Sequence, residues 1–241
     1  MRILITNDDG IEAEGIRILV EWAKTIGEVT VVAPKFEQSA KSHAINIHTP
    51  FEVTKRDIFG EDVEAYAVDS TPADCVRMAV CGFNKEFDVI FSGINKGVNM
   101  GDDILYSATC GALFEAGFLG INGIAFSTFW QSFECAKAKL GETFEFIMNN
   151  KLFDYNNIYN VNFPASSKGI RITKQGDHYY QDRYIDLGDG TYQAKGYCVH
   201  DNKHLDYVDT DATTDGYISV TPMSVKRTNY EAFEKLKSLN G

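Results

Sequence analysis

Apolar runs and helical apolar stripes alternate along the first two thirds of the chain. Residues 2–6 and 28–33 are short apolar runs typical of buried strands, and the segment between them carries apolar side chains at helical spacing up to Gly27. That stripe consists of Ile16, Leu19, Val20, Ala23 and Ile26. A strand, a helix and a second strand in this order predict a βαβ unit with a right-handed crossover.

The same alternation continues to about residue 165. Further strands are predicted at residues 63–68, 87–92, 123–128 and 158–163, and helices at residues 72–82, after residues 106–109 and at residues 133–149. Thr71 is expected to cap the first of these helices, because a hydroxyl before Pro72 is a favoured helix start. The pattern predicts a Rossmann-like α/β fold, with three α/β/α layers around a mostly parallel sheet.

The last third of the chain has a different character. Gly188-Asp189-Gly190 predicts a hairpin between residues 184–187 and 191–194, and extended segments are expected at residues 169–174 and 216–222. A capping box at residues 228–231 opens a final helix. One face of that helix carries Tyr230, Phe233 and Leu236.

We therefore predict one overall domain with two parts. Residues 1–165 form the Rossmann-like core, and residues 166–241 form a β-rich, hairpin-containing lobe with the terminal helix. The hairpin and the apolar helix face favour a docked or exchanged contact in a homodimer or homotetramer. Packing of the same face against the chain's own core is an equally good alternative.

Composition narrows the class of protein. With 44% hydrophobic and 24% charged residues the chain is typical of a globular protein, and it has neither an apolar run long enough for a membrane span nor a secretory signal. The five cysteines are scattered without a Cys-x-x-Cys, which argues against disulfides and thiolate zinc and favours the cytoplasm. A net charge of −11 argues against nucleic-acid polymers as partners. Small phosphorylated substrates remain compatible with it if a metal reverses the local field.

The first predicted strand ends at Asn7-Asp8-Asp9-Gly10. Ligands of open parallel sheets bind beyond the carboxyl ends of the strands, and two carboxylates there are costly unless a cation pairs with them. A hard divalent metal, which prefers oxygen ligands, is the simplest partner. Adjacent strand residues point to opposite faces, so both carboxylates reach one metal only if the chain turns at Gly10. The alternative is an acidic turn that leads into a helix cap.

A second informative stretch follows the strand at residues 87–92. Residues 93–103 are rich in glycine and asparagine, so their backbone N–H groups can approach an anion closely. Ser107 and Thr109 then stand at a helix start and form a candidate phosphate seat, or they only cap the helix. The polar residues 35–50, with Ser39 and His43, are typical of a solvated loop in which a lone histidine is a bystander.

Three common motifs are absent or incomplete. No G-x-G-x-x-G follows the first strand, which argues against NAD and FAD, and no P-loop pattern is present. Asp209-x-Asp211 with Asp215 is similar to a calcium loop, but Val220 stands at its twelfth position, where a glutamate is required. We interpret residues 209–216 as a solvated acidic loop.

Several motifs in one order along the chain carry a specific resemblance. They are Asn7-Asp8-Asp9-Gly10, the loop from Ala33-Pro34 to Ser39, Thr71-Pro72-x-Asp74-Cys75-Val76, Ser92-Gly93-Ile94-Asn95-x-Gly97-x-Asn99-x-Gly101-Asp102-Asp103, Tyr106-Ser107-x-Thr109, Asp209-x-x-Ala212 and Gly216-Tyr217-x-Ser219-x-Thr221-Pro222. With these motifs the chain resembles the SurE family, which are divalent-metal-dependent nucleoside 5′-monophosphate phosphatases (5′-nucleotidases). Such a set is far more specific than any one motif.

The resemblance implies a set of site residues. The ligands of one Mg²⁺ or Mn²⁺ per subunit would be Asp8, Asp9, Ser39 and Asn95, which replaces the solvated reading of Ser39. The catalytic residues would be Asp8, Asp9 and Asn95, and the residues around phosphate and substrate would be Asn7, Gly97, Asn99, Ser107 and Thr109. Departures from the family pattern at Ser70, Lys96, Ala108 and Cys110 bear on substrate preference more than on the reaction.

The implied reaction is hydrolysis of the phosphomonoester of nucleoside 5′-monophosphates. The metal would polarise a phosphoryl oxygen and lower the pKa of a bound water that attacks in line, with Asp8 or Asp9 as its base. Asn95, the loop amides, Ser107 and Thr109 would stabilise the charge on phosphate. A phospho-aspartate is less favoured, because no Asp-x-Asp or partner lysine motif is evident. The alternatives are a noncatalytic nucleotide-binding module and a broader phosphatase or exopolyphosphatase.

Overall fold

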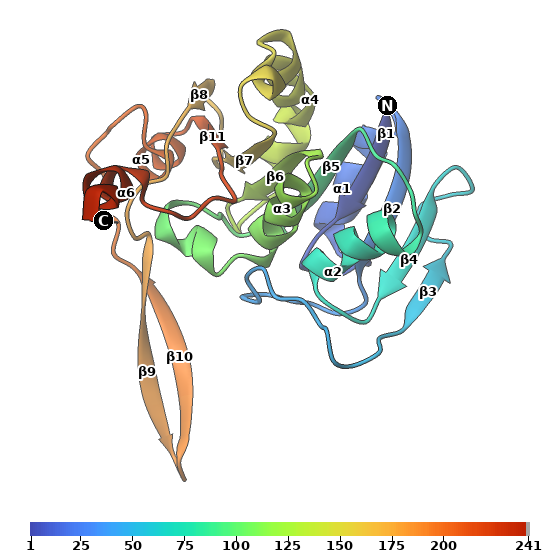
Figure 1. Ribbon diagram of the computed structural model, residues 1–241, viewed down its shortest axis with the longest axis horizontal. Coiled ribbons are helices and arrows are strands. Elements are labelled where there is room, and N and C mark those ends of the chain that lie inside the picture. The colour runs from blue at the N-terminus through green and yellow to red at the C-terminus, as the bar shows by residue number, and fades with distance from the viewer. Residues whose placement is uncertain (240–241) are drawn as a thin grey trace.

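The computed structural model describes residues 1–239 and confirms the predicted Rossmann-like α/β fold (Figure 1). Nine strands form one sheet in the order β3-β4-β2-β1-β5-β6-β7-β11-β8. Their bounds are β1 Arg2–Thr6, β2 Glu28–Pro34, β3 Val53–Arg56, β4 Glu64–Val68, β5 Val89–Lys96, β6 Asn122–Thr128, β7 Ile158–Phe163, β8 Ile170–Ile172 and β11 Ile218–Pro222. The six strands from β4 to β7 are parallel, whereas β3 and β11 run antiparallel to their neighbours β4 and β7.

Helices cover both faces of this sheet. Their bounds are α1 Glu14–Ala23, α2 Pro72–Arg77, α3 Ala108–Phe118, α4 Glu134–Asn149, α5 Asp209–Thr214 and α6 Tyr230–Leu236. Because side chains alternate along a strand, Ile3 and Ile5 of β1 face the core under α1 and α4, and Leu4 faces the core under α2 and α3. The sheet is therefore buried on both faces, and its ligand-binding positions are confined to the strand ends.

Most predicted elements are present, and the differences have local causes. The edge strand β3 was not predicted because its sequence, Val-Thr-Lys-Arg, is polar and only partly buried. Strand β5 continues to Lys96, so residues 93–96, expected in the glycine loop, belong to the strand, with a shift of register between Ser92 and Asn95. The last helix is capped by Asn229, whose side chain accepts from the N–H of Ala232, and not by Thr228.

The interpretation of residues 209–216 as a solvated acidic loop is wrong. Residues 209–214 form α5, and the side chains of Asp209 and Asp211 are buried. Backbone N–H groups of Gly101 and Gly176 donate to Asp209, which explains how a carboxylate is accommodated inside the protein. Sequence pattern alone gave no sign of these distant donors.

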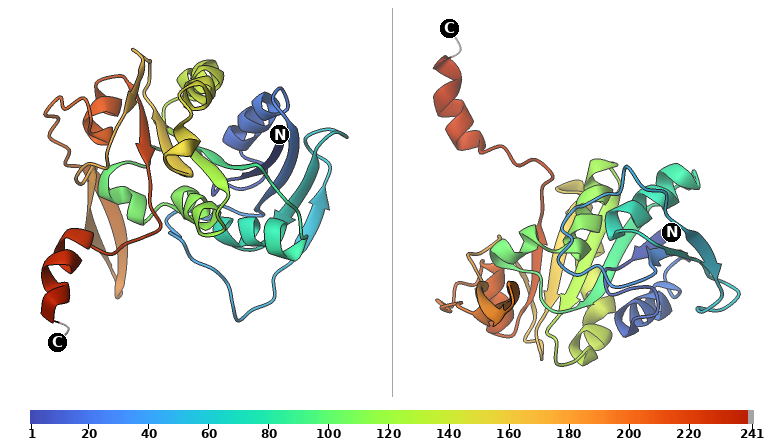
Figure 2. Two further views of the ribbon diagram at one scale, coloured as in Figure 1. Left: turned by 45° about the horizontal axis from the view of Figure 1, so that its top comes forward. Right: turned by 90° about the horizontal axis from the view of Figure 1, so that it is seen from below.

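The C-terminal third contributes to the main sheet as well as to projecting elements. Strand β11 lies between β7 and β8 in the sheet. Strands β9 (Tyr180–Gly188) and β10 (Thr191–Cys198) form the predicted hairpin, which stands clear of the body (Figure 1). Helix α6 also extends away from the rest of the chain (Figure 2), and none of its residues is buried.

Two features bear on the class of protein. Within residues 1–239, every helix is too short or too polar to cross a bilayer. All five cysteines are free thiols.

An aromatic cluster fills the core under α1 and α4. Ring centroids of Phe91 and Phe126 are 5.6 Å apart, and Trp22 and Phe144 pack against Phe91 at 5.6 and 5.8 Å.

Phe126→Ala should lower the free energy of unfolding by about 3–5 kcal/mol through lost contacts and a cavity, measured by urea denaturation. The control is Tyr155→Ala, which removes a side chain that is 84% exposed and should change it by less than about 0.5 kcal/mol. Equal effects of the two substitutions would contradict this account of the core.

Candidate active site

The candidate site lies where β1 and β5 end. The end of β1 leads into Asp8 and Asp9, the end of β5 carries Asn95, and helix α3 begins beside them. The backbone N–H of Gln38 donates to the carbonyl of Asp8 at 2.7 Å, so the loop that carries Ser39 is joined to the end of β1. Four segments far apart in the sequence thus meet at one sheet edge, as the strand pattern predicted.

Asp8 is the buried carboxylate of the site. Its side chain is 4% exposed, and the hydroxyl of Thr109 donates to Oδ1 at 2.5 Å. Burial raises the pKa of Asp8 to about 7, with a further contribution from the charge of Asp9, although hydrogen bonds from the Thr109 hydroxyl and backbone N–H oppose the rise. Asp8 is therefore a carboxyl that exchanges its proton near neutral pH.

Asp9 directly precedes the turn at Gly10, and Asn95 lies near the end of β5. Gly10 has φ of +98°, so the chain turns after the two carboxylates as expected. The backbone N–H of Lys96 donates to Asp9 Oδ2 at 3.3 Å, and burial, followed by the charge of Glu37, raises the pKa of Asp9 despite this bond. The Nδ2 of Asn95 donates to the carbonyl of Gly97 at 2.7 Å, so Oδ1 is the atom of this side chain that could coordinate a cation.

The amide of Asn7 gives a second observation on whether the site fits a cation. Its Nδ2 donates to the carbonyl of Gly10 at 2.8 Å, whereas its buried Oδ1 has no hydrogen-bond partner among residues 1–239. A buried acceptor without a donor is costly. Beside two carboxylates, this oxygen fits a site for a hard cation or for water bound to it.

The Ser39 loop is held in place by hydrogen bonds, and the hydroxyl of Ser39 binds Glu37 instead of Asp8 or Asp9. Ser39 is exposed, and its Oγ donates to Glu37 at 2.6 Å. The next part of the loop is held by Ser42, whose N–H and Oγ donate to the carbonyls of Tyr106 and Leu105 at 3.0 and 2.7 Å. The structure therefore brings the Ser39 loop to the site without joining Oγ to Asp8 or Asp9.

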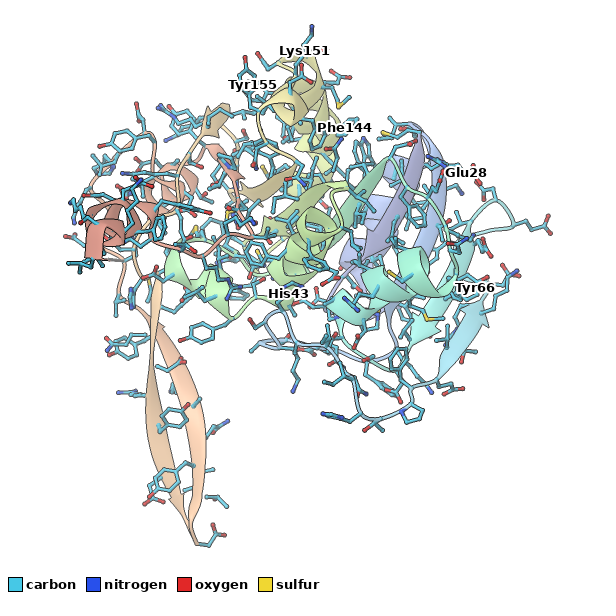
Figure 3. All side chains as sticks on the ribbon, viewed as in Figure 1. Glu28, His43, Tyr66, Phe144, Lys151 and Tyr155 are labelled. Atoms are coloured by element: carbon cyan, nitrogen blue, oxygen red, sulfur yellow. The ribbon has the colours of Figure 1, made fainter. Side chains whose placement is uncertain are left out.

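His43, labelled in Figure 3, ties the loop to helix α3. Its Nε2 lies 2.7 Å from Glu115, a buried carboxylate on α3 that also accepts from Arg77 of α2 at 3.0 Å. Burial acts to raise the pKa of Glu115, but the hydrogen bonds and charges of His43 and Arg77 outweigh it and lower the pKa. This ion cluster fixes the loop to α2 and α3, and sequence spacing gave no signal for it.

The two hydroxyls at the start of α3 have different roles. Ser107 caps the helix, because its Oγ accepts from the N–H of Cys110 at 3.1 Å. Thr109 is not a cap and instead binds Asp8. Gly97 has φ of +151° and belongs to the loop that leads to α3, while the side chain of Asn99 donates to buried Ser127 at 2.9 Å.

The departures from the family pattern occupy different environments. Cys110 is fully buried, and burial raises the pKa of its thiol to about 12, so it stays neutral. Ala108 is buried as well. Lys96 is exposed, with Nζ 5.9 Å from the centroid of the Phe133 ring, and Ser70 donates to Asp74 at 2.5 Å. Only Lys96 adds a charge at the site.

The donor set fits a divalent cation held by few carboxylates. Among residues 1–239, no group of three or more His, Cys, Asp or Glu side chains is arranged to hold a metal. The two carboxylates are supplemented by neutral oxygens of Asn7 and Asn95, which suits magnesium or manganese better than zinc. Repulsion between Asp8 and Asp9 and the cost of burying them would both be relieved by such a cation.

Comparisons with known proteins agree on one family. Residues 3–182 match the family model described as "Survival protein SurE". The chain is 37% identical to the 5′-nucleotidase SurE of Alkaliphilus metalliredigens and 39% identical to that of Caldanaerobacter subterraneus, with 98–100% of this chain and 96–99% of those proteins covered. A crystal structure of the SurE protein from Aquifex aeolicus is similar over both full chains, with 32% identity and a TM-score of 0.82.

The pKa of Asp8 predicts a pH dependence of stability without metal. The pKa of Asp8 is about 7 in the folded protein and 3.8 in the unfolded chain, because ionisation costs more when the carboxyl is buried. The protonated carboxyl therefore favours the folded state below pH 3.8, and this stability is lost as the pH rises from 3.8 to about 7. The difference between the two pKa values corresponds to about 4 kcal/mol in the free energy of unfolding. In EDTA, urea denaturation should show Asp8→Asn gaining about 2–4 kcal/mol relative to wild type between about pH 4.5 and about pH 8. Parallel pH curves for the two proteins would show that Asp8 ionises normally.

Proposed function

Because the chain belongs to the SurE family, we propose that it is a 5′-nucleotidase that hydrolyses nucleoside 5′-monophosphates with the help of one divalent cation. The observation that carries the proposal is the contact between Asp8 and Thr109. It places a carboxyl with a pKa of about 7 against the N-terminus of α3. A proton acceptor and an anion-binding helix terminus are thereby within one site.

The residues that would hold the cation are Asp8, Asp9, Asn95 and, after rotation of its side chain, Ser39. Bound there, Mg²⁺ or Mn²⁺ supplies a Lewis acid for phosphoryl oxygen and lowers the pKa of water. The unpartnered Oδ1 of Asn7 would accept a hydrogen bond from water in the same place.

The chain's own residues account for the rest of the chemistry. Asp8 or Asp9 takes the proton of the attacking water. The backbone N–H of Val98 and the hydroxyls of Ser107 and Thr109 would bind the phosphoryl oxygens, because the N–H groups of Gly97 and Asn99 donate to Thr128 and Asn162 inside the protein. The Ser107 hydroxyl accepts from Cys110 and keeps its own proton to donate to phosphate.

Asp8→Asn keeps the size of the side chain but removes the proton acceptor and one negative charge. Phosphate release from AMP with Mn²⁺ should fall about 100- to 10,000-fold, while the variant stays folded with a melting temperature in EDTA no lower than that of wild type. The matched control is Asp62→Asn, which alters an aspartate paired with Lys24 at the surface and should leave the rate unchanged. A folded Asp8→Asn protein with the wild-type rate would refute the proposal.

The substrate class is separable by the same assay. A metal-dependent nucleotidase should release phosphate from AMP, and EDTA should abolish this release. A noncatalytic binding module would release no phosphate with or without EDTA. Faster release from short polyphosphate or p-nitrophenyl phosphate than from any nucleoside 5′-monophosphate would favour the broader phosphatase.

We propose the cytoplasm as the compartment, since all five cysteines are free thiols.

We further propose that the protein is a homodimer or homotetramer. The apolar face of α6, formed by Tyr230, Phe233 and Leu236, is exposed in the single chain, and so are tyrosines of the hairpin. Single large apolar side chains at the surface are ordinary, but a helix with none of its residues buried has no packing that would keep it folded. A second copy would supply that packing.

A pair of charges on this face should break the assembly. Phe233→Asp combined with Leu236→Asp places two carboxylates in the proposed contact, so light scattering after size exclusion should report a smaller assembly than wild type. Lys235→Ala on the opposite side of α6 serves as the control and should keep the wild-type mass. An unchanged mass for the double variant would exclude this face from the contact.

A further inference from the structure

Asn99 is held on every side by buried polar groups. Its backbone N–H donates to Asn162 Oδ1 at 2.8 Å, and its carbonyl accepts from Asn162 Nδ2 at 2.9 Å and Asn160 Nδ2 at 2.7 Å. Its side-chain Nδ2 donates to Ser127 at 2.9 Å. All three side chains are fully buried: Asn160 and Asn162 on β7, and Ser127 near the end of β6. Four hydrogen bonds from three side chains thus fix one loop residue.

Gly101, two residues further on, is held from the other side by α5. Its N–H donates to Asp209 Oδ2 at 3.0 Å, while Asp209 Oδ1 accepts from Gly176 and Thr210. The backbone at Gly101 has φ of +57°, and a Cβ there would lie 2.0 Å from the carbonyl oxygen of Asp177. Only glycine leaves room for this close approach between the loop and the segment that leads to the hairpin.

We propose that Ser127, Asn160, Asn162 and Asp209 are positioning residues, which hold residues 97–101 in the conformation that binds the phosphate of the substrate. The proposal rests on the proposed function for its chemistry. It also changes the role of Asn99, which acts as the anchor of the loop through Asn160, Asn162 and Ser127.

The chemistry of these side chains fits a bracing role better than a role in substrate contact. A carboxamide presents one donor and one acceptor, so Asn162 matches the N–H and carbonyl of Asn99 at the same time. Neither leucine nor aspartate offers that pair. These groups make hydrogen bonds inside the protein and are fully buried, so the effect of losing them must pass through the loop.

Because the loop would stabilise charge that develops in the transition state, misplacing it should affect turnover more than binding. Asn162→Asp keeps the acceptor for the N–H of Asn99 and replaces the donor by an oxygen that repels its carbonyl. We expect kcat for AMP hydrolysis to fall about 10- to 100-fold, with a smaller change in KM. Ser127→Ala deletes one bond to Asn99 and should lower kcat about 3- to 10-fold in the same manner.

The matched control breaks an equally buried hydrogen bond elsewhere. Thr173 and Thr221 share a bond of 2.7 Å between β8 and β11, and Thr173→Val removes it without altering the side chain's shape. This variant should lose stability but keep the wild-type kcat. If it loses kcat as much as Asn162→Asp at equal stability, the effect is general destabilisation and the proposal is overturned.

Hydrogen exchange gives a readout that does not depend on activity. The backbone amides of residues 98–101 should exchange faster in Asn162→Asp and in Ser127→Ala than in wild type. In Thr173→Val they should exchange at the wild-type rate. Wild-type kcat in either bracing variant that folds, or unaltered exchange, would overturn the proposal. If Asn162→Asp fails to fold, Ser127→Ala decides. An inactive wild type would refute the proposed function instead, and exchange alone would then decide whether the loop is braced.

Discussion

The burial of one carboxylate, Asp8, beside a second, partly exposed one, Asp9, at the end of a parallel strand is the constraint on which the site depends. Asp8 is almost completely buried, and the charge of Asp9 next to it adds to the cost of ionisation. A protein tolerates such an arrangement when surrounding groups offset the charge or when a ligand does so. Here the N-terminus of α3, the hydroxyl of Thr109 and the N–H of Lys96 each offset part of it. The part of the ionisation cost that these groups do not offset would favour the binding of a cation.

The surrounding structure keeps these groups in place from several directions. The loop with Ser39 is tied to β1 through Gln38 and to α2 and α3 through the ion cluster around Glu115. The glycine loop is tied to β6, β7 and α5 through buried amides and a carboxylate. The polar interactions that organise the site are therefore mostly behind it, where they are protected from water and strengthened by the low dielectric.

Local pattern was sufficient for most of the fold. Apolar runs such as residues 158–163 and stripes such as that of α4 are long and regular, so periodicity located them. Strand β3 was missed because it is a short polar edge strand, and α5 because its aspartates owe their burial to donors far away in the sequence. The motifs placed Asp8, Asp9, Asn95 and Thr109 at one sheet edge, and the structure does bring them together there. No local pattern could have indicated that Asn162 and Glu115 support the loops, since both act through contacts between distant segments.

The order of strands in the sheet has a consequence for the biosynthesis of the protein. Strand β8 pairs only with β11, which is made almost fifty residues later, so the sheet cannot be completed while residues 218–222 are still inside the ribosome. Helix α5, which carries Asp209, also belongs to this late segment. A nascent chain can therefore collapse around β1, β2 and β5 early, yet the hydrogen bond by which Asp209 holds Gly101 can form only after residue 209 has been made.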